Sequence, residues 1–160
     1  MRQWREADLD AYADMVADPN VMRFLAEGSP LSRFGAWRQL AMYVGHWTMR
    51  GYGHWAVELR ATGEFVGRAG LWRPDGWPAL EIGWAIASPH QGRGYATEAG
   101  RVAQRLAWAN LDPDRLISLI RPGNQPSAAV ARKLGGVLDT TIDFMNGPTH
   151  VYAYPRPLTT

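Results

Sequence analysis

The chain has 160 residues, 46% of them hydrophobic and 20% charged, which are ordinary values for a globular protein large enough to bury a core. It contains no cysteine, so disulfides, thiolate metal sites and a cysteine nucleophile are excluded. The formal net charge is +2 and the sequence pI is near 9.2. The basic residues form no run, however, so nucleic-acid binding is disfavoured.

We expect neither a secretory signal peptide nor a membrane-spanning segment in this chain. The N-terminal segment is charged where a secretory signal peptide would be apolar, and no apolar run approaches membrane-spanning length. We therefore expect a cytoplasmic protein with no membrane association. No internal repeat, low-complexity segment or second domain is visible, so residues 1–160 are expected to form one domain.

The first half of the chain predicts two helices followed by a β-hairpin. Apolar residues recur at helical spacing twice, and two β-rich runs then flank a short turn that contains Gly63. The predicted elements are helices over 6–17 and 32–50, a connector over 20–29, strands over 54–59 and 64–72, and a Pro/Gly-rich loop over 73–78.

The stretch from Leu80 to Asn110 predicts a strand, a glycine turn and a helix in succession. The apolar run 80–87 is typical of a buried strand, which Pro89 should end or splay because proline cannot donate to a sheet ladder. The small-residue turn 91–96 follows, and 97–110 has the periodicity of a helix. Free N–H groups at such a helix start, together with the helix dipole, form an anion-binding device.

A glycine turn by itself is weak evidence for an anion site. Glycines between a strand and a helix often only make a tight turn. No Gly-Lys-Ser/Thr follows, so this is not a P-loop. A dinucleotide fingerprint fits poorly, because Thr97 stands where a small residue is required.

The last third of the chain predicts a strand, a helix and a closing hairpin. The strand 115–120 follows a helix and is expected to pair parallel to the central strand. The helix should cover 126–134, and the hairpin strands 137–144 and 151–154 should turn around 146–148. The fold class is therefore α/β, with a mixed, mostly antiparallel sheet of six or seven strands and helices on both faces.

Several sequence blocks, in order, resemble the GCN5-related N-acetyltransferase (GNAT) superfamily and its RimJ/RimL-like branch. The blocks are Glu81-Ile82-Gly83-Trp84, Gln91-Gly92-Arg93-Gly94-Tyr95-Ala96, Thr97-Glu98-Ala99, Asn124-Gln125-Pro126-Ser127 and Ala131-Arg132-Lys133-Leu134-Gly135. The second matches that superfamily's Gln/Arg-x-x-Gly-x-Gly/Ala signature. The resemblance implies a GNAT-like fold and acetyl transfer from acetyl-CoA to a primary amine, by direct attack in a ternary complex. The amine would belong to a protein N-terminus or a small molecule.

The resemblance also implies which residues bind acetyl-CoA or coenzyme A. The turn would hold the pyrophosphate, with Arg93 adding a charge-assisted contact, and the splayed strand around 86–88 would pair with the pantetheine amides. The implied cofactor-binding residues are Trp84, Ala85, Ile86, Ala87, Ser88, Gln91, Gly92, Arg93, Gly94, Tyr95, Ala96, Thr97 and Asn124.

Two residues are candidates for catalysis. Glu81 is an acidic residue inside an apolar strand, which costs desolvation unless it is paired or functional, so it is the candidate base. Alternatively, Glu81 is a carboxylate on a solvated face of the strand that holds an arginine. The resemblance implies that Ser127 lies near the sulfur as the general acid, whereas helix capping is its alternative role. No histidine has metal-ligand spacing, and no metal is expected.

Another function remains open from the sequence, a non-catalytic acyl-CoA-binding module. It would keep the turn 91–96 and Asn124 but would need neither Glu81 nor Ser127. Acceptor specificity is expected to come from the connector 20–35, the loop 73–78 and the hairpin tip 144–150. Homodimers are common in such enzymes, although nothing in the sequence specifies an interface.

Overall fold

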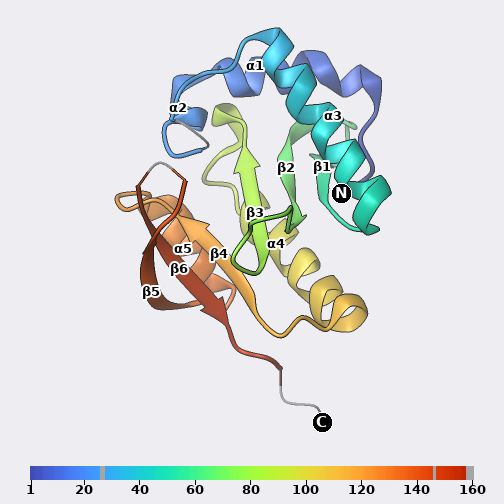
Figure 1. Ribbon diagram of the computed structural model, residues 1–160. Coiled ribbons are helices and arrows are strands. Elements are labelled where there is room, and N and C mark those ends of the chain that lie inside the picture. The colour runs from blue at the N-terminus through green and yellow to red at the C-terminus, as the bar shows by residue number, and fades with distance from the viewer. Residues whose placement is uncertain (26–27, 146, 158–160) are drawn as a thin grey trace.

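A computed structural model describes residues 1–25, 28–145 and 147–157 (Figure 1). Over these residues the sheet has six strands in the order β1-β2-β3-β4-β6-β5. Only the central pair, β3 and β4, is parallel. The predicted mixed, mostly antiparallel α/β sheet is therefore confirmed. None of the described helices combines the length and apolar character that a membrane span requires.

The elements follow the predicted order. The helices are α1 (Leu9–Ala17), α2 (Pro19–Met22), α3 (Arg33–Arg50), α4 (Tyr95–Leu106) and α5 (Gln125–Lys133). The strands are β1 (His54–Glu58), β2 (Phe65–Trp72), β3 (Leu80–Ile86), β4 (Leu116–Ile120), β5 (Val137–Asp143) and β6 (Pro148–Tyr154). Of the predicted hairpin turn, residue 146 lies outside the described residues.

Two local predictions were wrong. The connector after α1 contains a short helix, α2, because Asp18 accepts the Asn20 N–H as an N-cap and Pro19 follows at a first-turn position. The splayed strand was expected to run to Ser88, but β3 ends at Ile86 and Ser88 begins a 3₁₀ turn that contains Pro89. The Ser88 hydroxyl donates to the Asp18 carboxylate, which fixes this turn against the start of α2.

Helices cover both faces of the sheet, as predicted, and each face has its own core. On one face α1 and α3 pack on the sheet through Tyr12, Tyr43 and Trp72. On the other, α4 packs Ala103 against Leu71 of β2 and neighbouring apolar side chains of the sheet. Alternate strand residues point to opposite faces, so Trp72 and Leu71 belong to different cores. Figure 1 shows α1 to α3 grouped at one side of the sheet and α4 and α5 at the other.

The parallel strands β3 and β4 pair only at their amino ends and then part. The register contains two pairs, Leu80 with Leu116 and Glu81 with Ile117, and Figure 1 shows the carboxyl halves diverging. At the point of parting, the buried Ser118 hydroxyl donates to the Ile82 carbonyl at 2.6 Å. Because that hydroxyl has one proton, Tyr154 donates in turn to Ser118 at 2.7 Å. This relay holds the two halves of the sheet together at the base of the opening.

Replacing Ser118 with alanine should destabilise the fold. The change leaves the buried Ile82 carbonyl and Tyr154 hydroxyl without their partner, which costs about 1–3 kcal/mol of unfolding free energy. Urea unfolding of Ser118→Ala beside Ser127→Ala measures this. The latter removes a hydroxyl that has no protein partner within the described residues, so equal stability of the two variants would contradict the role given to Ser118.

Candidate active site

Two cavities lie on either side of the parting strands and share part of their lining. The first, of about 410 Å³, is called the Glu81 cavity. The second, of about 380 Å³, is called the glycine-turn cavity because the turn 91–97 forms one wall. Trp84, Asn124 and Ser127 line both. A molecule that extends from one cavity to the other would therefore pass these three side chains.

The glycine-turn cavity gathers most of the residues predicted to bind the cofactor. Those that line it are Trp84, Ala85, Ile86, Gln91, Gly92, Gly94, Tyr95, Ala96, Thr97 and Asn124. Ala87, Ser88 and Arg93 do not line it, and Arg93 is exposed. The chain's single lysine, Lys133, joins the wall from the last turn of α5.

The turn presents backbone rather than side chains to its cavity. Gly92 and Gly94 have φ of 74° and 87°, left-handed values that other residues adopt at a cost. The Gln91 side chain donates to the Ile86 carbonyl at 2.8 Å and so ties the turn to β3. Helix α4 has no side-chain cap, whereas α3 and α5 do. Its first N–H groups therefore remain available for an anion.

The alternation of β3 decides which backbone groups face the opening. The Ala87 N–H donates to Val66 of the β2 side at 2.9 Å, so odd-numbered residues of β3 direct their polar groups toward β2. Even-numbered residues direct theirs toward β4, as the bonds to the Ile82 and Ile86 carbonyls show. The N–H groups of Trp84 and Ile86 thus face the opening, and that of Ala85 does not.

Asn124 and Ser127 stand where the cavities meet. The Asn124 side chain accepts the Ser127 N–H at 3.2 Å and caps α5, so the residue that caps this helix is Asn124 and not Ser127. Capping uses only the side-chain oxygen, which leaves the amide NH₂ for another partner. Ser127 lines both cavities from the first turn of α5.

Glu81 is half-buried, on the wall of its cavity. Burial raises the pKa of its carboxyl to about 7, although Trp77, the Leu119 backbone and Arg68 act in the opposite direction. The Trp77 indole N–H donates to Oε2 at 2.6 Å, and no ion pair within the described residues includes Glu81. The alternative of a solvated carboxylate holding an arginine is therefore wrong, because the side-chain partner of Glu81 is a tryptophan.

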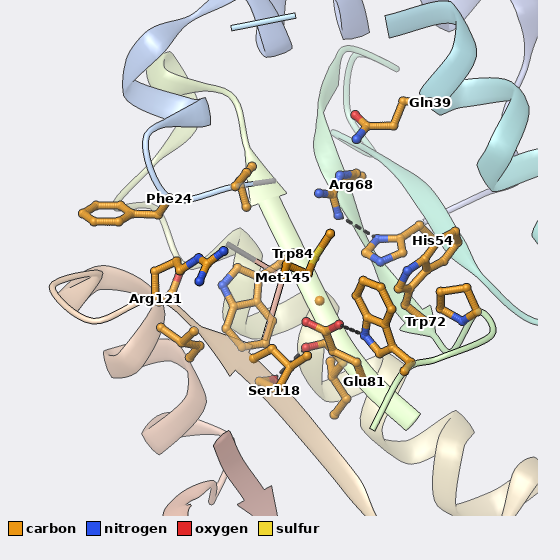
Figure 2. Close-up of a pocket in the computed structure, with 18 of the residues that line it drawn as sticks. Phe24, Gln39, His54, Arg68, Trp72, Glu81, Trp84, Ser118, Arg121 and Met145 are labelled. Atoms are coloured by element: carbon orange, nitrogen blue, oxygen red, sulfur yellow. Dashed lines mark hydrogen bonds between the residues drawn. The ribbon is translucent and has the colours of Figure 1, made fainter. Parts of the chain in front are cut away.

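Arg68 and His54 also face the Glu81 cavity, and the sequence analysis did not identify them. Strand register places Arg68 of β2 and His54 of β1 on the same face as Glu81, and Figure 2 shows all three pointing into the cavity. Arg68 Nη1 lies 3.1 Å from His54 Nδ1. The signal available in the sequence was a charged residue inside the apolar run FVGRAGLW, the same signal that identified Glu81.

Three separate segments complete the wall of the Glu81 cavity. They are the connector with Met22, Phe24 and Leu25, the loop with Pro74 and Trp77, and the hairpin tip with Phe144, Met145 and Thr149. The Trp77 and Phe144 rings pack edge to face, with their centroids 4.9 Å apart. The loop and the hairpin are therefore in contact next to Glu81, to which Trp77 is hydrogen-bonded. These are the segments predicted to set acceptor specificity, except that residues 26–27 and 146 lie outside the described residues.

The chain belongs to the GNAT acetyltransferases. Residues 1–137 match the family described as the acetyltransferase (GNAT) domain. The uncharacterized protein YkkB of Bacillus subtilis (strain 168) is 34% identical over 142 residues, which are 84% of this chain and 78% of that protein. The structure of an acetyltransferase from Agrobacterium tumefaciens str. C58 is 32% identical with a TM-score of 0.85, covering 96% of this chain and 88% of that one.

The fold is also shared with a relative solved together with coenzyme A. The RimL ribosomal L7/L12 α-N-protein acetyltransferase in that complex has a TM-score of 0.78 at 19% identity, with 95% of this chain and 90% of that chain covered. At this identity the likeness concerns the fold. Acetyl-CoA, or coenzyme A after transfer, is the cofactor of the family. The uncapped α4 start and the free amides of the parting strand fit its pyrophosphate and its amides.

The buried carboxyl of Glu81 should make stability fall with rising pH. Its folded pKa of about 7 exceeds the ordinary 4.5, so between these values the native state binds the proton more tightly than the unfolded state. The free energy of unfolding should therefore decrease by about 2–3 kcal/mol from pH 4.5 to 7. Denaturant titrations of wild type and Glu81→Gln across this range measure the difference. Parallel curves for the two proteins would contradict the raised pKa.

Proposed function

We propose that the protein transfers acetyl from acetyl-CoA to a primary amine in a ternary complex, with Glu81 as the general base. The observation that carries the proposal is a buried carboxyl of pKa about 7 on the wall of one cavity. That cavity shares Trp84, Asn124 and Ser127 with the cavity of the glycine turn. An amine in the first cavity would therefore face a thioester reaching in from the second.

The residues of this chain supply the binding and the proton transfers. Acetyl-CoA, when bound, supplies the acetyl group as a thioester. The N–H groups of Gly94-Tyr95-Ala96 bind the pyrophosphate, and the N–H groups of Trp84 and Ile86 bind and orient the amide and carbonyl oxygens. Glu81 takes the proton that the attacking nitrogen must lose, directly or through a water. Ser127 lies at the junction and donates a proton to the departing sulfur.

A pKa near 7 suits this base. A carboxyl with the ordinary value would be ionised at neutral pH but too weak to take a proton from an ammonium group. Raising the pKa of the carboxyl brings it closer to the pKa of an amine, and about half of the carboxyl remains ionised at pH 7. Glu81 is not needed in a non-catalytic acyl-CoA-binding module, and burying an unpaired carboxyl would only cost that module stability. The proposed enzyme accounts for the residue better.

The remaining expectations belong to this proposal. The motif Glu81-Ile82-Gly83-Trp84 and the segment from Asn124 to Gly135 support the RimJ/RimL-like branch, although the branch does not identify an acceptor. A single domain, a cytoplasmic location and a homodimer stay predictions.

Turnover should depend on Glu81 and Ser127. We expect thiol release from acetyl-CoA with an amine acceptor, and a loss of roughly 10²–10⁴-fold in kcat/KM for Glu81→Gln. In wild type kcat/KM should rise with pH until about 7, and this limb should vanish in the variant. Ser127→Ala should lower kcat and leave the KM for acetyl-CoA unchanged. Glu6→Gln, an exposed glutamate remote from the cavities, is the matched control. Full activity in Glu81→Gln would rule out the proposed base.

Coenzyme A should bind and stabilise the protein, and NAD should not. The glycine turn matches a CoA pyrophosphate and lacks the second half of a dinucleotide site. Saturating CoA at about a hundred times its Kd should add about 2.7 kcal/mol of stability, which a thermal melt detects. Gln91→Ala releases the turn from Ile86 and should weaken this effect, whereas Gln3→Ala should not. Equal stabilisation by NAD would point to a nucleotide-binding module.

A further inference from the structure

Arg68 is a half-buried cation whose hydrogen bonds the protein does not complete. Its Nη1 lies 3.1 Å from His54 Nδ1, and its buried Nε has no partner within the described residues. Its guanidinium lies over the Tyr43 ring, 5.3 Å from the centroid. None of the ion pairs of the described residues includes Arg68. Most arginines at this depth have a carboxylate partner.

The guanidinium nevertheless stays charged. Burial acts to lower the pKa of Arg68, but the phenols of Tyr43 and Tyr12 and the Glu81 carboxyl outweigh it, and the net direction is upward. Glu81 is a weak counter-ion because it is about half protonated at pH 7. A buried cation without a full counter-ion is costly, and the cost falls when an anion arrives. The strands thus present an unmet positive charge to the cavity.

The contact with Arg68 also fixes the state of His54. A guanidinium can only donate, so His54 Nδ1 accepts and the ring proton is on Nε2. Burial, Arg68 and His46 keep the pKa of His54 well below its usual value, so the ring is neutral. If Gly83 carried a β-carbon, that atom would lie 3.2 Å from His54 Nε2 and 3.8 Å from Glu81 Oε1. Both side chains therefore lie over Gly83. The donor on His54 and the acceptor on Glu81 therefore flank one stretch of β3.

The other described walls of the cavity favour a small acceptor that is not a polycation. The lining is mostly apolar and aromatic. Its charged members within the described residues are Arg68, Arg121 and Glu81, so the field of the cavity is positive. Arg121 Nη1 is already used, because it donates to the Gly147 carbonyl at 2.8 Å and to Thr149 Oγ1 at 3.0 Å and holds the hairpin. What distinguishes Arg68 is its buried Nε, which has no partner within the described residues (both arginines are labelled in Figure 2).

We propose that the acceptor is a small amine that also carries a carboxylate, as an amino acid does, and that Arg68 binds this carboxylate while the amine lies at Glu81. The planar guanidinium matches a carboxylate in shape and charge, and His54 Nε2–H is a further donor on the same wall. This inference rests on the proposed acetyltransferase function, since it names the acceptor of that site. An aromatic or large apolar side chain on the amino acid would fill the remaining volume.

The test compares acceptors that differ only in the carboxylate. Thiol release is measured with phenylalanine, methionine and leucine, with the carboxamide of each, and with the corresponding decarboxylated amines. We expect the amino acids to have kcat/KM higher on the order of 10²-fold than their neutral counterparts. If the carboxamides or simple amines are used as well as the amino acids, or if only peptide N-termini are used, the inference is wrong and the acetyltransferase function stands.

Variants of Arg68 then assign the preference to this side chain. Arg68→Gln should remove the preference for the carboxylate by raising the KM for amino acids, with the KM for acetyl-CoA and the stabilisation by CoA unchanged. Arg68→Lys keeps the positive charge but lacks the planar pair of donors of a guanidinium, so it should retain part of the preference for the carboxylate. Arg60→Gln, an exposed arginine of the β1–β2 hairpin, is the control. An equal loss for amino acids and carboxamides in Arg68→Gln would mean that Arg68 only supports the fold.

A binding measurement separates this inference from the proposed activity. Calorimetry with CoA-saturated protein compares N-acetylphenylalanine with N-acetylphenylalanine amide, and it needs no turnover. Binding of the acid alone, lost in Arg68→Gln, would support the carboxylate site even if every amine failed as a substrate. If neither ligand binds wild type, or both bind equally, Arg68 is not a carboxylate site for this class of ligand.

Discussion

The parting of two parallel strands is the constraint on which the rest of the structure depends. A parallel pair that ended its ladder early would leave buried N–H and C=O groups without partners, which folded proteins rarely tolerate. Here the Ser118 hydroxyl satisfies the Ile82 carbonyl, and Gln91 satisfies that of Ile86. The groups between them face an opening. The sheet is thus held on both sides of the place where a cofactor with its own amides can continue the ladder.

Strands β1, β2 and β3 carry ionisable side chains to one face of the sheet. Residues in register on neighbouring strands point to one face, so Arg68, His54 and Glu81 are brought together without any loop being involved. Placing these groups inside the protein costs stability, because burial disfavours the charged form of Glu81 and the protonated form of His54. Tyr43 and Trp72 pack against each other and against the His54 ring. The proposed chemistry therefore rests on strand residues, while loops and helix α3 form much of the remaining cavity wall.

The sequence predicted the fold and a set of residues of which most line one cavity, and it did so for a physical reason. The run 80–110 carries local signals, namely apolar periodicity, two glycines and a helix start, and all act within a few residues of one another. Helix α4 begins at Tyr95, slightly earlier than its periodicity predicted, because Gly94 adopts the left-handed conformation at the cap. The 3₁₀ turn at Ser88 was missed because it is held by Asp18, which contacts Ser88 across 70 residues of sequence. The α2 helix was missed although its signal, Asp18 followed by Pro19, is local.

The acceptor side was harder to predict, since its walls come from three segments that meet only in the folded chain. Trp77 bonds Glu81 and contacts Phe144 from the far hairpin, and no spacing rule connects those positions. Arg68 was visible in principle, because a single arginine in an apolar strand raises the same question as Glu81 does. Answering it requires the sheet register, which places the two residues on one face of adjacent strands. A charged residue in a predicted strand is therefore best assessed together with the charges on its predicted neighbours. For Glu81 and Arg68, the shared face is what supports the proposed base and the proposed substrate-binding cation.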